Sequence, residues 1–132
     1  MRKMDYKRVQ IISAELAHLG YEENKQRTAN LKSCLDDLSI RYNEGVGVYK
    51  NSVETCLVIL PRDIGESVMI NTLVFRQFGQ ECTLYQDRQG DAYLYYPSKK
   101  PVHIGKLREM PQVLARKQDS YTLVNNKYYA IA

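Results

Sequence analysis

The chain has 132 residues, of which 44% are hydrophobic and 26% are charged. This length fits one compact domain over residues 1–132, and the composition is too apolar for a disordered chain. The formal net charge of +4 excludes a strongly acidic DNA-mimicking inhibitor and leaves only a mild attraction for anionic partners.

The N-terminal third predicts a strand followed by a helix. Residues 7–19 alternate loosely between apolar and polar and end at Gly20, which is typical of a strand and its stop. Over residues 22–38 the apolar side chains recur at i, i+3, i+4 and i+7, the spacing of an amphipathic helix. These side chains are Leu31, Cys34, Leu35 and Leu38.

The middle third predicts a hairpin and a second helix. Residues 45–49 and 53–60 form the two strands, with Lys50-Asn51-Ser52 as the turn. Pro61 blocks continuation of the second strand, and Asp63 can cap a helix over residues 64–78. Gly79 is the C-terminal stop of that helix.

The C-terminal third predicts two more hairpins. Residues 82–86 and 92–96 flank a turn rich in glycine and aspartate, and residues 121–124 and 128–131 flank Asn125-Asn126-Lys127. Residues 97–120, which contain three prolines, are expected to be irregular. The order β, α, β, β, α, β predicts an α+β, ferredoxin-like βαββαβ sandwich, whose antiparallel sheet is extended by a C-terminal β-hairpin.

The sequence offers few conventional catalytic groups. The three cysteines, Cys34, Cys56 and Cys82, are scattered without the spacing of a zinc site or a disulfide framework, which predicts free, buried thiols. The two histidines, His18 and His103, are expected at the surface. We therefore expect no metal and no cofactor.

No apolar run approaches the roughly 20 residues of a membrane span, and the first residues do not form a secretory signal. We expect a cytoplasmic protein that does not bind membranes.

Gly45-Val46-Gly47 falls in a hairpin, so a β-bulge or a close backbone approach is favoured over a phosphate cradle.

Two further features are ambiguous from the residues alone. The 11 tyrosines are mainly expected to pack on strands, although aromatic faces can also stack on bases or attract a cation such as a sulfonium. Glu54 near the start of a strand and Gln89 in a turn resemble ordinary surface residues.

Several short motifs occur one after another along the chain. They are Ser13-Ala14, the stretch around Ser33 and Leu35, Gly47-Val48-Tyr49, the strand from Glu54 to Arg62-Asp63, Gln80-Glu81-Cys82-Thr83-Leu84, and Tyr121-Thr122-Leu123 with Tyr129. In this order they resemble the bacteriophage enzymes that degrade S-adenosylmethionine (SAM), long called SAM hydrolases and now regarded as SAM lyases. Counting on from Cys82 places the family's glutamine at Gln89, and Val53-Glu54 retains one carboxylate of the family's acidic pair.

The resemblance implies a lyase that cleaves SAM to 5′-methylthioadenosine and L-homoserine lactone, with the substrate's own carboxylate as nucleophile. It implies Glu54 and Gln89 as catalytic residues and Tyr49, Tyr42 and Gln80 as substrate-binding residues. It also implies a homo-oligomer, a trimer with sites between subunits, and an anti-restriction role in the cytoplasm of an infected bacterium.

Three alternatives stay open at this stage. The enzyme could be a hydrolase that gives homoserine directly, or a catalytically inactive relative that only sequesters a nucleoside. The third is a ferredoxin-like module that binds RNA or a nucleotide, although no segment matches the RNP1 pattern and no nucleic-acid partner is expected.

Overall fold

The computed structural model of the chain describes residues 6–49 and 52–132. Eleven elements follow one another along these residues: β1 (Val9–Ile12), α1 (Tyr21–Asp37), β2 (Asn43–Tyr49), β3 (Ser52–Ile59), α2 (Ile64–Gln77), β4 (Thr83–Gln86), β5 (Asp91–Tyr96), β6 (Lys99–Met110), α3 (Gln112–Ala115), β7 (Ser120–Val124) and β8 (Lys127–Ile131). The first six elements have the predicted order, although β1 is much shorter than the expected strand. The predicted turn at residues 50–52 falls mostly outside the described residues.

The strands form a closed antiparallel barrel in the order β1-β3-β2-β7-β8-β6-β5-β4, with β4 returning to β1. The predicted ferredoxin-like sandwich is therefore wrong. An open sheet of the first four strands would leave β2 and β4 as edges with unpaired backbone groups. Instead β7 pairs with β2 and β5 pairs with β4, so the C-terminal half of the chain closes the barrel.

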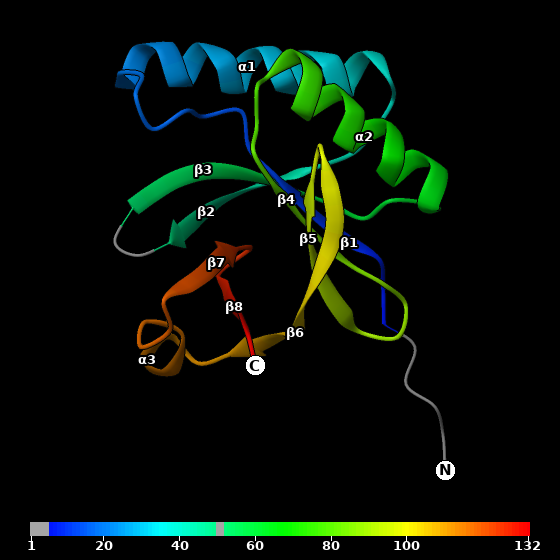
Figure 1. Cartoon of the computed structure of the whole chain (residues 1–132). Coiled ribbons are helices and arrows are strands. Elements are labelled where there is room, and N and C mark those ends of the chain that lie inside the picture. The colour runs from blue at the N-terminus through cyan, green and yellow to red at the C-terminus, as the bar shows by residue number, and fades with distance from the viewer. Residues whose placement is uncertain (1–5, 50–51) are drawn as a thin grey trace.

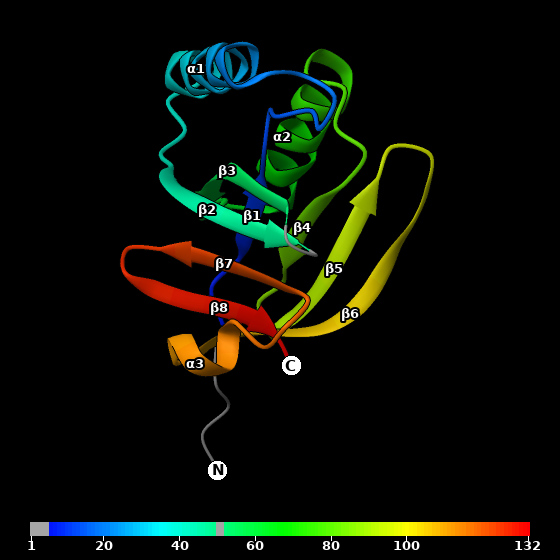
Figure 2. The same cartoon turned by 90° about the vertical axis from the view of Figure 1, so that its left-hand side faces the viewer.

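The expectation that residues 97–120 are irregular is also wrong, because they contain β6 and α3. Pro101 is tolerated because β6 has only β5 beside it at that point, and its pairing with β8 begins at Leu107. The register with β5 shifts near Gly105, whose φ of +123° suits glycine. In Figure 2 the β5–β6 hairpin extends past the rest of the barrel on the side of α2.

The main core lies outside the barrel, between two helices and the sheet. Figure 1 shows α1 and α2 together over one side of the barrel, where they cover β1 and β3. The buried side chains of this core are Ile12, Ala14, Leu31, Leu35, Ile40, Leu57, Ile59, Ile70, Val74 and Phe78. The alternate residues of β1 and β3 point the other way, into the barrel.

Local signals at the ends of α2 are confirmed. The carboxylate of Asp63 accepts a hydrogen bond from the Glu66 N–H at 2.8 Å, as expected of an N-cap residue. Gly79 follows the helix with φ of +59°, the left-handed conformation typical of a helix stop. Among the described residues, no helix is long and apolar enough to cross a membrane.

Gly45 is required by a close backbone approach, as one of the two sequence interpretations predicts. A Cβ atom at this position would lie 2.8 Å from the Leu123 carbonyl oxygen, whereas one at Gly47 would meet Glu54 Cγ at an ordinary 3.7 Å. We expect Gly45→Ala to lower the free energy of unfolding by about 1–3 kcal/mol, because the backbones of β2 and β7 must separate. Urea denaturation measures this loss, and Gly47→Ala is the matched control. Equal stability of the two variants would contradict the prediction.

Candidate functional site

Glu54 lies near the start of β3, at the barrel end where β1 finishes and β4 begins. It stands opposite Gly47 in the register of β2 and β3, so both positions share one face of the sheet. Val58, on the same face of β3, lines the inside of the barrel. Glu54 therefore points toward the mouth of the barrel, which we call the Glu54 end.

The segment that follows β1 brings a second carboxylate to the Glu54 end. One carboxylate oxygen of Glu15 accepts a hydrogen bond from the Thr55 N–H at 2.6 Å. The Ser13 hydroxyl donates to the Thr55 carbonyl oxygen at 3.0 Å and accepts from the Glu15 N–H at 3.1 Å. The two bonds to Thr55 fasten the segment after β1 to β3, directly beside Glu54, and the third holds the turn within that segment.

The pKa of Glu54 is raised above its ordinary value of 4.5, first by burial of the carboxyl group and second by the charge of Glu15. A hydrogen bond from Ser13 acts in the opposite direction. Since the hydroxyl has one proton, this bond competes with the one to Thr55. The Glu54 residue stays exposed to solvent while its carboxyl group is partly desolvated.

Two thiols lie close enough to Glu54 to be influenced by its charge. Burial raises the pKa of Cys56 to about 12, and the charge of Glu54 adds to this rise. Burial and Glu54 also raise the pKa of Cys82. Both thiols are therefore protonated near neutral pH and do not act as thiolate nucleophiles.

Arg27 and Gln80 support the segment that carries Glu15. The guanidinium of Arg27 donates from Nε to the Ala14 carbonyl at 2.6 Å and also donates to the Phe78 carbonyl. Nε2 of Gln80 donates to the Glu15 carbonyl at 3.0 Å. Helix α1 and the loop after α2 thus both hold the backbone of the Glu54 end.

A family model described as the S-adenosylmethionine lyase family matches residues 10–132, which is nearly the whole chain. The chain belongs to this family. The resemblance inferred from the short motifs is thereby confirmed, and the protein is an SAM lyase. The match gives no support to the hydrolase or to the RNA-binding alternative. No curated protein matches the sequence.

The structure brings two of the three predicted substrate-binding residues of the lyase to the Glu54 end. Tyr49, at the end of β2, is 60% exposed and pairs in register with Ser52, two residues from Glu54. Such diagonal neighbours on one face are within reach of an aromatic side chain. Gln80 reaches this end through its bond to the Glu15 carbonyl.

Gln89 and Tyr42 lie elsewhere in the same chain. Gln89 is exposed in the turn after β4, whereas the Glu54 end meets the first residues of β4. Its N–H donates to an Asp87 carboxylate oxygen at 2.9 Å, and its carbonyl accepts from Lys106 Nζ at 3.1 Å. Tyr42 precedes β2 and packs on the helix-covered core. Glu54 and Gln89 therefore occupy opposite ends of the barrel in one chain of the lyase.

The imidazoles and thiols of the lyase are placed much as predicted. Both His18 and His103 are exposed, and one ring nitrogen of His103 lies 3.2 Å from an Asp91 carboxylate oxygen. The three cysteines are free; Cys56 is buried, whereas Cys34 and Cys82 are half-buried rather than fully buried. The described residues contain no group of three or more histidine, cysteine, aspartate and glutamate side chains that could hold a metal ion.

Sequence reasoning missed the roles of Glu15 and Arg27. Glu15 interrupts the apolar pattern after β1, and this interruption was the available signal of an acid just beyond a strand end. Its partner, Thr55, is 40 residues away along the chain. Only the register of β1 with β3 brings the two together.

Proposed function

We propose that the lyase cleaves SAM to 5′-methylthioadenosine and L-homoserine lactone in one displacement. A carboxylate oxygen of the substrate attacks its own γ-carbon and forms the new C–O bond. The C–S bond breaks, and its electron pair passes to sulfur, which changes from a sulfonium cation to a neutral thioether. No proton moves and no water is consumed, so the enzyme need only fold the methionine tail and exclude water.

The observation that carries this proposal is the chemistry of the Glu54 end. It presents carboxylates and protonated thiols, Cys56 and Cys82, rather than an ionised thiol. A reaction in which the substrate supplies its own nucleophile suits such a site. Glu15 and Glu54 give the site a negative potential that attracts the cationic substrate.

We assign Glu54 to the ribose hydroxyls rather than to the sulfonium. An anion beside sulfur would stabilise the positive charge of the substrate more than the transition state, in which that charge is disappearing. A hydrogen bond from a ribose hydroxyl is equally strong in both states and holds the nucleoside while the tail reacts. A carboxylate with a raised pKa gains from such a donor, since it is short of solvent.

We further propose that the active site forms between subunits of a homo-oligomer, a trimer as the resemblance implies. Glu54 and Gln89 lie at opposite ends of one subunit, so a single substrate can contact both only when two subunits meet. Val53 and Val46, next to the Glu54 end, are 65% and 40% exposed, which suits a surface covered by a neighbour. Gln89 of the neighbour would then orient the methionine tail.

The activity would act in the cytoplasm of a phage-infected bacterium. Removal of SAM deprives the methylases and SAM-dependent nucleases of host restriction of their cofactor, which is an anti-restriction role. The gene can be transferred into a phage whose DNA carries restriction sites, and the plating efficiency of this phage can be measured on a restricting host. An unchanged plating efficiency would contradict the anti-restriction role.

The test of the reaction is incubation of the purified enzyme with SAM in H₂¹⁸O, followed by mass spectrometry. We expect 5′-methylthioadenosine and homoserine lactone as first products, with ¹⁸O entering only as the lactone opens slowly in solution. Homoserine that carries ¹⁸O from the earliest time points would support hydrolysis instead. Intact SAM after prolonged incubation would overturn the proposed reaction.

A further inference from the structure

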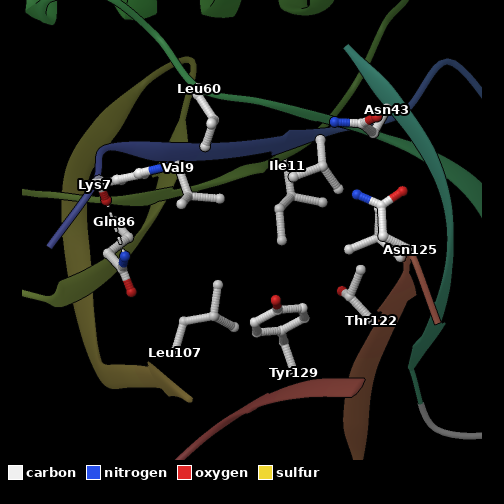
Figure 3. Close-up of a pocket in the computed structure, with 12 residues that line it drawn as sticks. Lys7, Val9, Ile11, Asn43, Leu60, Gln86, Leu107, Thr122, Asn125 and Tyr129 are labelled. Carbon is white, nitrogen blue, oxygen red and sulfur yellow. Dashed lines mark hydrogen bonds between the residues drawn. The ribbon is translucent and has the colours of Figure 1, made fainter. Parts of the chain in front are cut away.

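The interior of the barrel is hollow at the end away from Glu54. A cavity of about 290 Å³ is lined by residues of every strand except β5, and Figure 3 shows lining side chains around an open space. This volume is close to the roughly 300 Å³ at which small-molecule sites begin. The inside of an eight-stranded barrel can hold one small ligand. Neither Glu15 nor Glu54 lines the cavity, so it is separate from the proposed active site.

Half of the residues that line the cavity are aliphatic. Its apolar lining residues are Val9, Ile11, Val58, Leu60, Leu107 and Val124. Lys7 is the one charged residue among those that line it, and it is exposed to solvent at the rim. A cation would enter without an anionic partner and against the charge of Lys7, so the wall favours a neutral molecule with an apolar body.

Gln86 places an unsatisfied acceptor in this wall. The side chain is only 6% exposed, and its Nε2 donates to the Lys7 carbonyl at 3.0 Å, which fixes the orientation of the amide. Its Oε1 is buried and has no hydrogen-bond partner among residues 6–49 and 52–132. A buried acceptor of this kind is normally paired, so a ligand with an N–H donor would meet a real requirement of the cavity.

Tyr129 adds an aromatic face and a second polar group. Figure 3 shows its hydroxyl directed toward the space between the lining side chains, with Thr122 beside it. We propose that the barrel cavity is a second ligand site, which takes a neutral, planar molecule of about two fused rings whose N–H donates to Gln86 Oε1. This site is independent of SAM cleavage.

The experiment compares two probes of the same shape, indole and benzofuran, of which only indole has the N–H donor. Ligand binding to the full chain is followed by saturation-transfer and ¹H–¹⁵N correlation NMR. We expect indole to bind with a Kd on the order of 0.1–1 mM, as for a nine-atom ligand, and benzofuran about tenfold more weakly. Shifted amide signals should belong to the strands around the cavity.

Variants separate the acceptor from the cavity. Gln86→Met keeps the size of the side chain but lacks the acceptor, so indole should lose its tenfold advantage over benzofuran. Val9→Phe fills the space and should abolish binding of both probes; Leu107→Trp, from another part of the wall, serves the same purpose if Val9→Phe does not fold. Gln118→Met, at an exposed glutamine outside the cavity, should change nothing.

Failure of indole to bind up to its solubility limit would overturn the proposal, as would equal affinity for benzofuran or retained binding in a folded, filled variant. SAM cleavage is measured on the same samples. Cleavage without indole binding would reject the second site alone, whereas indole binding without cleavage would reject the proposed reaction alone.

Discussion

Glu54→Gln should reduce kcat/KM for SAM by about 10- to 100-fold, with most of the loss in KM. A hydrogen bond from a ribose hydroxyl to a carboxylate contributes about 1.5–3 kcal/mol, and an amide oxygen replaces it only weakly. The interaction is as strong in the ground state as in the transition state, which is why KM should carry the loss. Steady-state kinetics with separation of the nucleoside product measures both constants.

The same substitution should stabilise the fold at neutral pH. The folded pKa of Glu54 lies above the unfolded value, so its contribution to stability is greatest when the carboxyl is protonated and is lost as the pH rises through the folded pKa. Glutamine removes the repulsion by Glu15 that appears above that pH. We therefore expect a higher Tm for Glu54→Gln than for the wild type at pH 7, and a smaller difference at pH 4.

Glu109→Gln is the matched control, because Glu109 is an exposed strand carboxylate whose ion pair with Lys127 spans 3.7 Å. It should leave both Tm and kinetics nearly unchanged. A Glu54→Gln enzyme with wild-type kcat/KM would remove Glu54 from the site. A loss confined to kcat would indicate that Glu54 contacts the reacting groups rather than the ribose.

The pH profile offers an independent check on the same carboxylate. Protonation of Glu54 removes its negative charge and weakens it as an acceptor, so kcat/KM should fall on the acid side with a midpoint above the ordinary 4.5 of glutamate. In Glu54→Gln this acid limb should be absent. A midpoint at or below 4.5 in the wild type would contradict the desolvation of Glu54.

Local chemistry predicted the helices better than the sheet. Asp63 and Gly79 act on residues within one helical turn, so their roles as cap and stop of α2 could be inferred from the sequence. The closure of the barrel depends on pairings such as Gly47 with Thr122, which no local pattern records. Pro101 indicated irregular structure, but a strand tolerates proline where one side lacks a neighbour.

The candidate site also has features that the sequence predicted and features that it could not predict. Glu54 and Gln89 were selected only through resemblance to the family, because a strand-end acid and a turn amide are ordinary by themselves. The contribution of Glu15 depends on its bond to Thr55 across the sheet, and the position of Gln89 depends on the length and direction of β4. Distances between ends of a barrel follow from topology, which the sequence order alone left open.

The position of Glu54 and Gln89 at opposite ends of the barrel leads to a second prediction, on the activity of mixed variants. Glu54→Gln and Gln89→Ala should each be poorly active alone, yet a mixture of the two, unfolded and refolded together in equal amounts, should regain activity. In a ring of subunits where each site takes Glu54 from one subunit and Gln89 from the next, about a quarter of the sites receive both intact residues. At SAM concentrations below KM the specific activity of the mixture should therefore approach about a quarter of the wild-type value, whereas Glu54→Gln refolded by itself should keep only the low kcat/KM expected above.

A second mixture distinguishes the two geometries from the opposite direction. Wild type is refolded with an equal amount of the double variant Glu54→Gln/Gln89→Ala. About a quarter of all sites in this mixture should be intact if the sites lie between subunits, but about half if each subunit holds a complete site. No regain in the first mixture together with half activity in the second would show that Gln89 does not share a site with Glu54 of a neighbour. The Glu54 end would then act with residues of its own subunit, such as Tyr49, and Gln89 would leave the catalytic assignment.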